Sequence, residues 1–329
     1  MFSLRVAGVG SYLPPNRVSS AELERLHSWP QGWIERTTGV RERRNATNET
    51  SAQMAARAAE RALQHAGLEG RDLDLIIGAS ASQQQCIPCT SVFVQKELGL
   101  ESVGVPCFDI NVTCLSFLQA LHTAAHFLEA GTYRRILVYS SEITSLSLNW
   151  GERESSALFG DAAAAVVLTR AREEEPSRLW SARFLTDSSG AHLTQMKGGG
   201  TLNHPNNPAT TPDMNQFTMQ GGQVFKAAMR QMPPFLDAFF AGLPWQKSDV
   251  DAVVPHQASL HAIAQLTKRL GFTKEQVVVN LPERGNCIAA SIPLALCEAV
   301  EAGRIGRGHK LLLLGTGAGL SLGAVALTF

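Results

Sequence analysis

A cysteine, a histidine and an asparagine stand at points where strands are expected to meet helices. Cys114 lies in the stretch DINVTCLSFLQAL, between a polar dipeptide and an apolar, helix-like run. His256 ends the strand-like segment VVPHQAS, and Asn286 stands before a second apolar run. A thiol at the start of a helix feels a positive potential, which favours the nucleophilic thiolate. With two further hydrogen-bond donors, the set predicts acyl transfer with oxyanion or enolate stabilisation.

From the sequence alone, Cys114 and His256 could also have purely structural roles. A buried cysteine often packs as a small hydrophobe, and a histidine in a strand turn is often structural. Cys86 and Cys89 form the motif CIPC, whose spacing also occurs in redox and metal sites, but no second such pair or nearby histidine accompanies it. We therefore expect no metal site. The cysteines with core-like neighbours, to which we assign no chemistry, are Cys107, Cys287 and Cys297.

Composition limits the class of protein. The chain has 329 residues, 44% of them hydrophobic, with 29 basic and 29 acidic side chains. This is enough for a full core, and the charge balance argues against bulk nucleic-acid binding. Glycines interrupt the apolar stretch Leu311–Phe329, which indicates two buried strands joined by a turn rather than a membrane span. Without a signal-peptide pattern or a disulfide framework, we expect a soluble, cytoplasmic protein that binds no membrane.

The elements that must position the three residues occur twice along the chain. DLDLIIGASAS at residues 72–82 matches DVDAVVPHQAS at 249–259, and RRILVYSSE at 134–142 matches HKLLLLGTG at 309–317. Between these strands each half has an amphipathic helix ending in Leu-Gly and an apolar helix ending in Ala-Gly. The repeat predicts two halves, residues 1–171 with the cysteine and residues 178–329 with the histidine and asparagine. The charged segment Arg172–Ser177 would join them.

The two apolar helices predict the centre of the fold. Residues 114–129 and 288–298 are apolar on all sides, as expected of helices buried in a core. Two mixed α/β halves around such helices indicate a sandwich of stacked sheet and helix layers. Alignment of the Ala-Gly pairs places Cys114 opposite Asn286, at equivalent helix entrances. A pseudo-twofold arrangement would bring both toward the centre, near the strand end that carries His256.

Over nearly its whole length the sequence resembles the thiolase-like condensing enzymes, most closely the β-ketoacyl-acyl-carrier-protein synthase III family. The resemblance implies a thiolase-like α/β fold of five layers, αβαβα, with two pseudo-repeated halves. It also implies a homodimer and a ping-pong reaction that needs no cofactor besides its CoA thioester substrates. The matching stretches are GSYLPPNRVSSAELE, GWIERTTGVRERR, DINVTCLSF, ALFGDAAAAVVL, FTMQGGQVFKAAM, VVPHQAS, ERGNCIAASIPLAL and the closing glycine turn.

The resemblance gives the catalytic residues their roles. Cys114 would take an acyl group from an acyl-CoA primer, and a malonyl thioester on acyl carrier protein or CoA would then lose carbon dioxide and attack it. His256 and Asn286 would hold the malonyl carbonyl and stabilise the enolate. The backbone N–H groups of Cys114 and Ala318 would form the oxyanion hole. Ala318 replaces the middle glycine of the family's turn and has less freedom in φ.

The resemblance also implies binding residues, several of which depart from the family pattern. Trp33 and Arg153 match residues that hold the adenine end of CoA, and Gly221 is assigned to the same substrate. Ile87 and Thr316 replace phenylalanines of the acyl pocket, which predicts a reshaped pocket and longer primers. The expected carrier-docking patch consists of Lys226, Lys268 and Arg269, with His261 in place of its arginine, while Thr37 replaces an arginine of the CoA clamp.

Two other functions remain as alternatives. A secondary-metabolite enzyme of the same fold would condense or transfer longer or unusual acyl thioesters. A non-catalytic partner subunit would keep the fold for dimerisation, but the presence of all three catalytic residues argues against it. Asn286 favours carbon–carbon bond formation, since relatives that only transfer acyl groups tend to lose it. Ile87 stands where head-to-head condensing relatives carry a glutamate, which argues against that group.

Overall fold

Two central sheets with the same strand pattern organise the chain. The computed structural model describes residues 1–329. In the first sheet the order is β1 (Arg5–Tyr12), β7 (Ala162–Thr169), β6 (Arg135–Glu142), β4 (Leu75–Gly78) and β5 (Cys107–Asp109). In the second it is β8 (Arg178–Thr186), β13 (Ser321–Thr328), β12 (Lys310–Gly317) and β11 (Ala252–Pro255). In both sheets an antiparallel hairpin, β6–β7 or β12–β13, continues a parallel pair.

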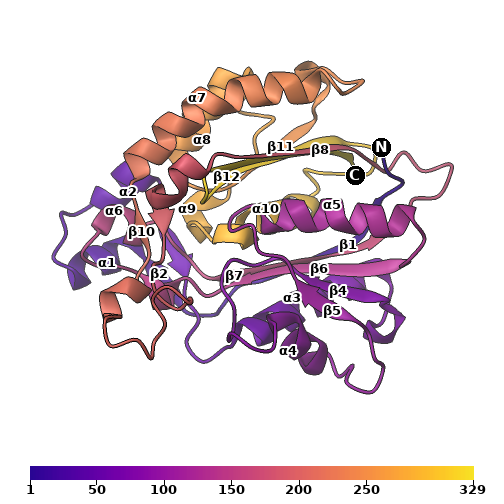
Figure 1. Ribbon diagram of the computed structural model, residues 1–329. Helices are drawn as coiled ribbons and strands as arrows, with labels where there is room; N and C mark the ends of the chain where they lie inside the picture. Colours follow the sequence, from indigo (N-terminus) through magenta and orange to yellow (C-terminus); the bar gives the residue numbers. More distant parts are fainter.

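Helices complete a sandwich of five layers (Figure 1). Helices α3 (Ser51–Ala66) and α4 (Thr90–Glu97) cover the outer face of the first sheet. Helices α5 (Ser116–Glu129) and α10 (Ser291–Glu301) lie between the two sheets. Helices α7 (Gly221–Phe240) and α8 (Leu260–Leu270) cover the second sheet from outside. The αβαβα sandwich expected from the sequence is therefore confirmed.

The structural repeat is longer than the repeat visible in the sequence. Each half opens with an additional strand and helix, β1–α3 in one and β8–α7 in the other. The third strand of the second half is reduced to a single bridge between Val253 and Val277. The matched acids Asp74 and Asp251 do the same work, since each accepts the N–H that starts the neighbouring parallel strand. The distances are 2.9 Å to the Arg135 nitrogen and 2.7 Å to the Lys310 nitrogen.

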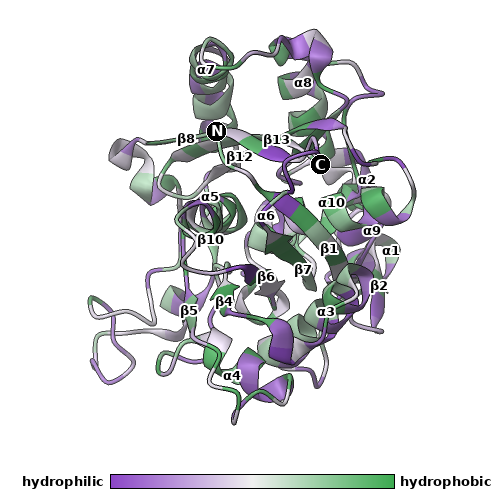
Figure 2. Ribbon diagram, turned by 90° about the vertical axis from the view of Figure 1, so that its right-hand side faces the viewer, coloured by the Kyte–Doolittle hydropathy of each residue, from purple (hydrophilic) through white to green (hydrophobic).

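The central helices belong to one core shared by both halves. A cluster of 38 buried residues includes Leu118 and Leu121 of α5 together with Leu294 and Leu296 of α10. Figure 2 shows α10 and β7 in the hydrophobic colour, while hydrophilic colour lies mainly on the outer loops and helix faces. Helices without a polar face can be stable here because sheets cover them on two sides. None of the helices combines the length and apolar character needed to cross a membrane.

Several short elements, among them α1 (Ser20–Leu26), α2 (Trp33–Thr38), α6 (Arg153–Ser156) and β10 (Thr218–Met219), gather around one end of the sandwich (Figure 1). The segment 186–215, which begins at the last residue of β8, contains one strand of a small hairpin and two 3-10 turns. The remaining helix is α9 (Leu281–Arg284), and the remaining strands are β2 (Arg17–Ser19), β3 (Glu42–Arg44) and β9 (Thr194–Gln195). The 3-10 turns are η1 (Gly70–Asp72), η2 (Ser145–Ser147), η3 (Ser188–Leu193), η4 (Pro212–Asn215), η5 (Lys247–Asp249) and η6 (Ile288–Ala290).

Candidate active site

One cavity of about 300 Å³ brings together the residues that the sequence singled out. Cys114 enters it from the turn before α5, and His256 from the end of β11. Asn286 stands between α9 and η6, and Ala318 in the turn between β12 and β13. Four segments that are far apart in the sequence therefore meet at one space. The rest of the lining is mainly apolar and includes Leu148, Leu158, Phe159, Phe217, Met219 and Ile288.

The backbone around Cys114 differs from the expected helix start. Helix α5 begins at Ser116, two residues later than the sequence predicted. Thr113 has a φ of 50°, in the left-handed region, and turns the chain before the helix. The amides of Leu115 and Ser116 donate to the carbonyl oxygens of Val112 and Thr113, both at 3.1 Å. They are thus occupied locally, and Cys114 belongs to a tight turn rather than to the first helical turn.

The protonation state of Cys114 also differs from the expectation. Burial, with a smaller contribution from the charge of Glu142, raises the pKa of the Cys114 thiol to about 12. Hydrogen bonds to the sulfur from the backbone N–H groups of Ala318 and Cys114 oppose this shift without cancelling it. Desolvation disfavours the charged form and outweighs the favourable helix potential. The sequence analysis considered the helix potential, which favours the thiolate, and not the burial, which opposes it here.

His256 is a neutral imidazole held in a confined position. Burial lowers its pKa to about 4, so the ring is uncharged near pH 7. Its backbone N–H donates to the Leu314 carbonyl oxygen at 2.8 Å, continuing the pairing of β11 with β12. Gly315 makes room for it, since a Cβ there would lie 2.8 Å from the His256 Cβ. A neutral imidazole offers one donor and one acceptor nitrogen, so His256 can take a proton or donate a hydrogen bond.

Asn286 is fixed by backbone bonds to the other half of the chain. Its N–H donates to the Leu158 carbonyl oxygen at 2.8 Å, and its own carbonyl accepts from Gly160 at 3.1 Å. The side-chain Oδ1 accepts the N–H of Ile288 at 2.9 Å. The Nδ2 amide is therefore the part of the side chain left to donate to a bound carbonyl or enolate oxygen.

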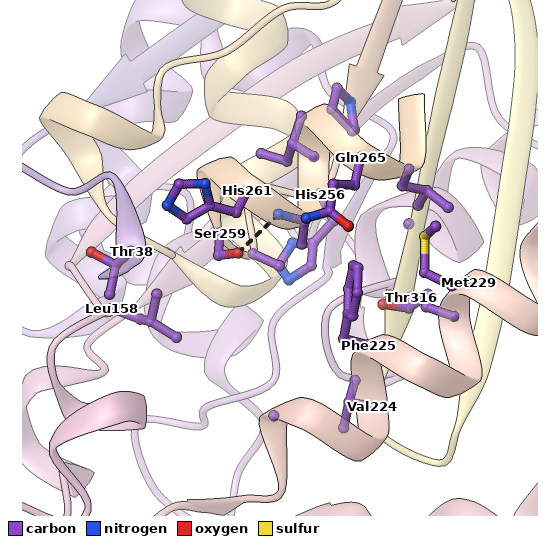
Figure 3. Close-up of a pocket in the computed structure, with 18 of the residues that line it drawn as sticks. Thr38, Leu158, Val224, Phe225, Met229, His256, Ser259, His261, Gln265 and Thr316 are labelled. Carbon is purple, nitrogen blue, oxygen red and sulfur yellow. Dashed lines mark hydrogen bonds between the residues drawn. The ribbon is translucent and has the colours of Figure 1, made fainter. Parts of the chain in front are cut away.

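A second cavity, of about 360 Å³, meets the first at His256 and Thr316, which border both. Its walls include Thr37 and Thr38 of α2, Glu154 and Ser155 of α6, and Gly221 and Phe225 of α7. Figure 3 shows Thr38 and His261 on one side of His256, with Phe225, Met229 and Thr316 on the other. The two cavities therefore offer space on both sides of the histidine.

Trp33 and Arg153 lie against each other next to this second cavity. Trp33 is the first residue of α2 and Arg153 the first of α6, and the cavity is lined by the last two residues of α2 and by Glu154 and Ser155 of α6. The Arg153 guanidinium carbon is 4.6 Å from the centroid of the Trp33 ring, a cation–π contact. A flat ring inserted between them would need about 7 Å, twice a van der Waals contact distance. The pair is closed in this structure, and its two side chains would have to separate before a flat ring could enter between them.

The remaining residues expected to bind substrate or carrier are spread over several surfaces. Ile87 is 83% exposed and borders neither cavity. Lys226 lies with Arg230 in a separate polar cleft, on a different face of α7 from the residues that line the second cavity. The His261 Nε2 donates to the Arg36 carbonyl oxygen at 2.9 Å. Lys268 and Arg269 are exposed in the last turn of α8.

Glu142 is a buried acid near the site that the sequence analysis did not assign. It ends β6, and its carboxylate accepts the N–H groups of Ala81 at 2.6 Å and Ser82 at 3.0 Å. Both of these residues line the Cys114 cavity. Burial raises the Glu142 pKa to about 7. The signal was available, since an acid at the end of the apolar strand segment RILVYSSE is unusual unless it is paired or functional.

The five-layered sandwich, with a cysteine, a histidine and an asparagine on one cavity, places the protein in the thiolase-like class. Family models agree: that of 3-oxoacyl-[acyl-carrier-protein] synthase III matches residues 108–188, and that of its C-terminal part matches residues 241–329. A beta-ketoacyl-[acyl-carrier-protein] synthase III of Vesicomyosocius okutanii is 36% identical over 325 residues, 99% of this chain and 98% of that protein. The chain belongs to the 3-oxoacyl-[acyl-carrier-protein] synthase III family and is an acyltransferase of the condensing type.

Solved structures show the same relationship. The crystal structure of 3-oxoacyl-[acyl-carrier-protein] synthase III from Aquifex aeolicus VF5 is 35% identical and superimposes with a TM-score of 0.89, covering 99% of this chain and 100% of that one. The priming beta-ketosynthase from the R1128 polyketide biosynthetic pathway is 32% identical, with a TM-score of 0.89, and the alignment covers 99% of this chain and 96% of that one. The same fold therefore occurs in a protein named as a 3-oxoacyl-[acyl-carrier-protein] synthase III and in one named for a polyketide pathway.

Proposed function

We propose that this protein condenses an acyl-CoA primer with a malonyl thioester through an acyl-enzyme on Cys114. One observation carries the proposal: Cys114, His256, Asn286 and the turn containing Ala318 border a single, mainly apolar cavity. A nucleophile, two carbonyl-binding side chains and a backbone donor are the groups that acyl transfer followed by carbon–carbon bond formation requires. The reaction needs no cofactor besides its thioester substrates.

In the first half-reaction the Cys114 sulfur attacks the primer thioester carbonyl. The thiol must lose its proton, and neutral His256, on the same cavity, is able to accept one. The tetrahedral oxyanion is stabilised by the N–H groups of Cys114 and Ala318, which converge on the sulfur position. Collapse breaks the carbon–sulfur bond to CoA, whose thiolate takes up the proton, and leaves the acyl group on Cys114.

In the second half-reaction a malonyl thioester occupies the same space. Loss of carbon dioxide leaves an enolate, whose oxygen accepts hydrogen bonds from His256 and from the Asn286 amide. The enolate carbon attacks the acyl-Cys114 carbonyl, and the oxyanion forms again between the two backbone N–H groups. Collapse breaks the carbon–sulfur bond to Cys114 and releases a 3-oxoacyl thioester, and the Cys114 thiolate takes up a proton from solvent to restore the thiol. Asn286 has no proton to give or take near pH 7, so its role is electrostatic.

The second cavity accommodates the CoA arm. Gly221, the last residues of α2 and the single turn of α6 line its wall. Trp33 and Arg153 begin these two helices, which supports them as contacts for the nucleotide end of CoA. Carrier docking is assigned to Lys226, His261, Lys268 and Arg269. Lys268 and Arg269 are exposed cations on α8, whereas Lys226 lies on another side of α7. The acidic surface of the carrier protein would therefore contact two separate groups of basic side chains, one on α8 and one on α7.

A homodimer completes this proposal. Strand β5 is the edge of the first sheet, with no strand on its outer side. Such an edge offers free N–H and C=O groups to a second copy. Ile87 and Val103 are exposed apolar side chains in the segments that flank α4, before β5. In the dimer Ile87 would border the acyl tunnel of the partner, and Thr316 the tunnel of its own chain.

A second setting, secondary metabolism, is favoured by two observations. The R1128 priming ketosynthase superimposes with the same TM-score as the Aquifex aeolicus enzyme, 0.89, at 32% against 35% identity. Thr316, at the junction of the two cavities, is smaller than the phenylalanine that the resemblance places there. The smaller side chain at Thr316 favours primers longer than acetyl in an otherwise identical reaction.

The direct experiment is product analysis. The protein would be incubated with acetyl-, hexanoyl-, octanoyl- or decanoyl-CoA and with malonyl-CoA or malonyl acyl carrier protein. We expect a 3-oxoacyl thioester two carbons longer than the primer, together with carbon dioxide, and neither from Cys114→Ala. Acyl transfer without loss of carbon dioxide in every combination would contradict the condensing function.

A further inference from the structure

Two buried charged residues lie beneath the Trp33–Arg153 pair. Glu24 of α1 and Arg43 of β3 are 4% and 1% exposed, although charged side chains are rarely buried without partners. Neither residue borders one of the two cavities. Their hydrogen-bond partners include the two segments that carry Trp33 and Arg153.

Glu24 holds the backbone on both sides of Trp33. Its Oε2 accepts the N–H of Gly32 at 2.7 Å, and its Oε1 accepts the N–H of Ile34 at 2.8 Å. Hydrogen bonds to a carboxylate are short and strong, and a pair of them on flanking residues fixes both position and direction. The place of the Trp33 ring therefore depends on one carboxylate that is itself out of reach of a ligand.

Arg43 makes the corresponding contact on the other side. One guanidinium nitrogen donates to the Ala157 carbonyl oxygen at 2.7 Å, and the Ala157 N–H closes α6 by donating to the Arg153 carbonyl oxygen at 3.1 Å. The other donates to the Ser20 Oγ at 3.2 Å, at the start of α1. Burial lowers the Arg43 pKa to about 10, and the Glu24 charge opposes that shift. Arg43 thus joins the helix of Arg153 to the helix of Glu24.

We propose that Glu24 and Arg43 are positioning residues: they hold the backbone segments that carry Trp33 and Arg153, so that the two side chains can move apart and stack on the nucleotide end of CoA. The inference rests on the proposed function, because it takes the Trp33–Arg153 pair as the nucleotide contact. It differs from a purely structural role in one measurable respect. A residue that acts through Trp33 affects ligands that carry a nucleotide and spares ligands that lack one.

The test is the affinity of the full-length protein for CoA and for pantetheine, by titration calorimetry. Trp33→Ala should weaken CoA binding about fivefold to a hundredfold, the range for loss of base stacking on an aromatic ring. It should leave pantetheine binding unchanged. Glu24→Gln keeps the side-chain size but replaces one acceptor oxygen with a donor amide that faces a backbone N–H. We expect about a threefold to tenfold loss for CoA and none for pantetheine.

Asp74→Asn is the matched control. Asp74 also accepts two backbone N–H groups, of Arg134 and Arg135, but at the far end of the first sheet. The Asp74→Asn variant should have the same ratio of CoA affinity to pantetheine affinity as the wild type. The double variant Trp33→Ala/Glu24→Gln should bind CoA no more weakly than Trp33→Ala alone. Arg43→Lys, which keeps the charge but cannot reach both partners, should reproduce the selective loss if Glu24→Gln fails to fold.

Two results would overturn the inference while leaving the proposed reaction intact. One is an equal loss of CoA and pantetheine affinity in Glu24→Gln and Arg43→Lys. The other is full additivity of Glu24→Gln with Trp33→Ala. If Trp33→Ala left CoA binding unchanged, the nucleotide contact would be wrong and the inference with it. Condensation of acyl-pantetheine primers would still test the proposed function separately.

Discussion

The backbone N–H of Asn286 donates to the carbonyl oxygen of Leu158 at 2.8 Å, across the two halves of the chain. The neighbouring Gly160 returns a bond to the Asn286 carbonyl at 3.1 Å. The N-terminal half, which carries the nucleophile, thus also sets the position of the asparagine that would stabilise the enolate. Condensation should therefore be sensitive to changes near Leu158 that leave the environment of Cys114 intact.

Gly160→Ala tests this dependence. A Cβ at Gly160 would lie 2.2 Å from the Arg284 carbonyl oxygen, so the segment before Asn286 must move. We expect the acyl-enzyme on Cys114 to form normally while condensation falls about a hundredfold, as for loss of one oxyanion donor. Gly200→Ala is the control, because nothing lies within 4 Å of the added methyl group. Equal losses in acylation and condensation would argue against a separate role for the hydrogen bonds that join Asn286 to Leu158 and Gly160.

The pH dependence of Cys114 reactivity is a second prediction. Since its pKa is raised to about 12, the thiolate fraction and the rate of iodoacetamide reaction at Cys114 should rise about tenfold per pH unit from pH 7 to 10. Peptide mapping at each pH would measure the alkylation of Cys114 separately from that of the other cysteines. A rate that levels off below pH 8 would show a thiolate already formed, which would contradict the effect of burial.

Glu142→Gln should raise that reactivity. The anionic carboxylate disfavours the thiolate, so removing its charge lowers the Cys114 pKa. Glu142 has a pKa of about 7, so in the wild type its charge is present above that pH and lost below it. The ratio of variant to wild-type alkylation rate should therefore be larger at pH 9 than at pH 6. Glu301→Gln, whose charge raises the pKa of Cys297, should leave the ratio for Cys114 near one.

The layers of the fold could be predicted from the sequence because they depend on local patterns. The apolar helices and the strand pairs flanking them are visible as hydrophobic runs, and the structure places them as expected. The outer pairs β1–α3 and β8–α7 escaped the repeat because their sequences share no comparable motif. The start of α5 was misplaced by two residues because the left-handed turn at Thr113 has no glycine to announce it.

The residues of the site could be predicted from the sequence, but their protonation states could not. Cys114, His256 and Asn286 could be named from motif and repeat. The raised pKa of Cys114 could not, because it depends on burial and on Glu142, which is 28 residues away by number and adjacent only in space. Glu24 and Arg43 were likewise invisible, since the charged faces of α1 and β3 look solvent-exposed until the fold buries them.

Ile87 should control primer length only in a dimer. In one chain its side chain is 83% exposed and outside both cavities, so any effect on the acyl chain must come through a second copy. We expect a dimer at micromolar concentration by light scattering. Each methylene buried in the tunnel contributes about 0.8 kcal/mol, close to fourfold in affinity. Ile87→Phe should therefore shift preference from decanoyl- and octanoyl-CoA toward hexanoyl- and acetyl-CoA.

Leu26→Phe provides the control for this substitution, because Leu26 is also an exposed apolar residue, at the end of α1. It should leave chain-length preference unchanged. A monomeric protein, or fastest acylation of the wild type by acetyl-CoA, would remove the basis for an enlarged tunnel shared between two chains.

The central claim is that one cysteine carries the acyl group between two separable half-reactions. Intact-protein mass spectrometry after incubation with a panel of acyl-CoAs, followed by malonyl-CoA or malonyl acyl carrier protein, tests it most directly. We predict a gain of one acyl mass in the wild type that disappears when the malonyl thioester is added. Cys114→Ala should gain nothing, and Asn286→Ala should gain the acyl mass and keep it. An acyl mass on Cys114→Ala, or its discharge from Asn286→Ala at the wild-type rate, would contradict the account.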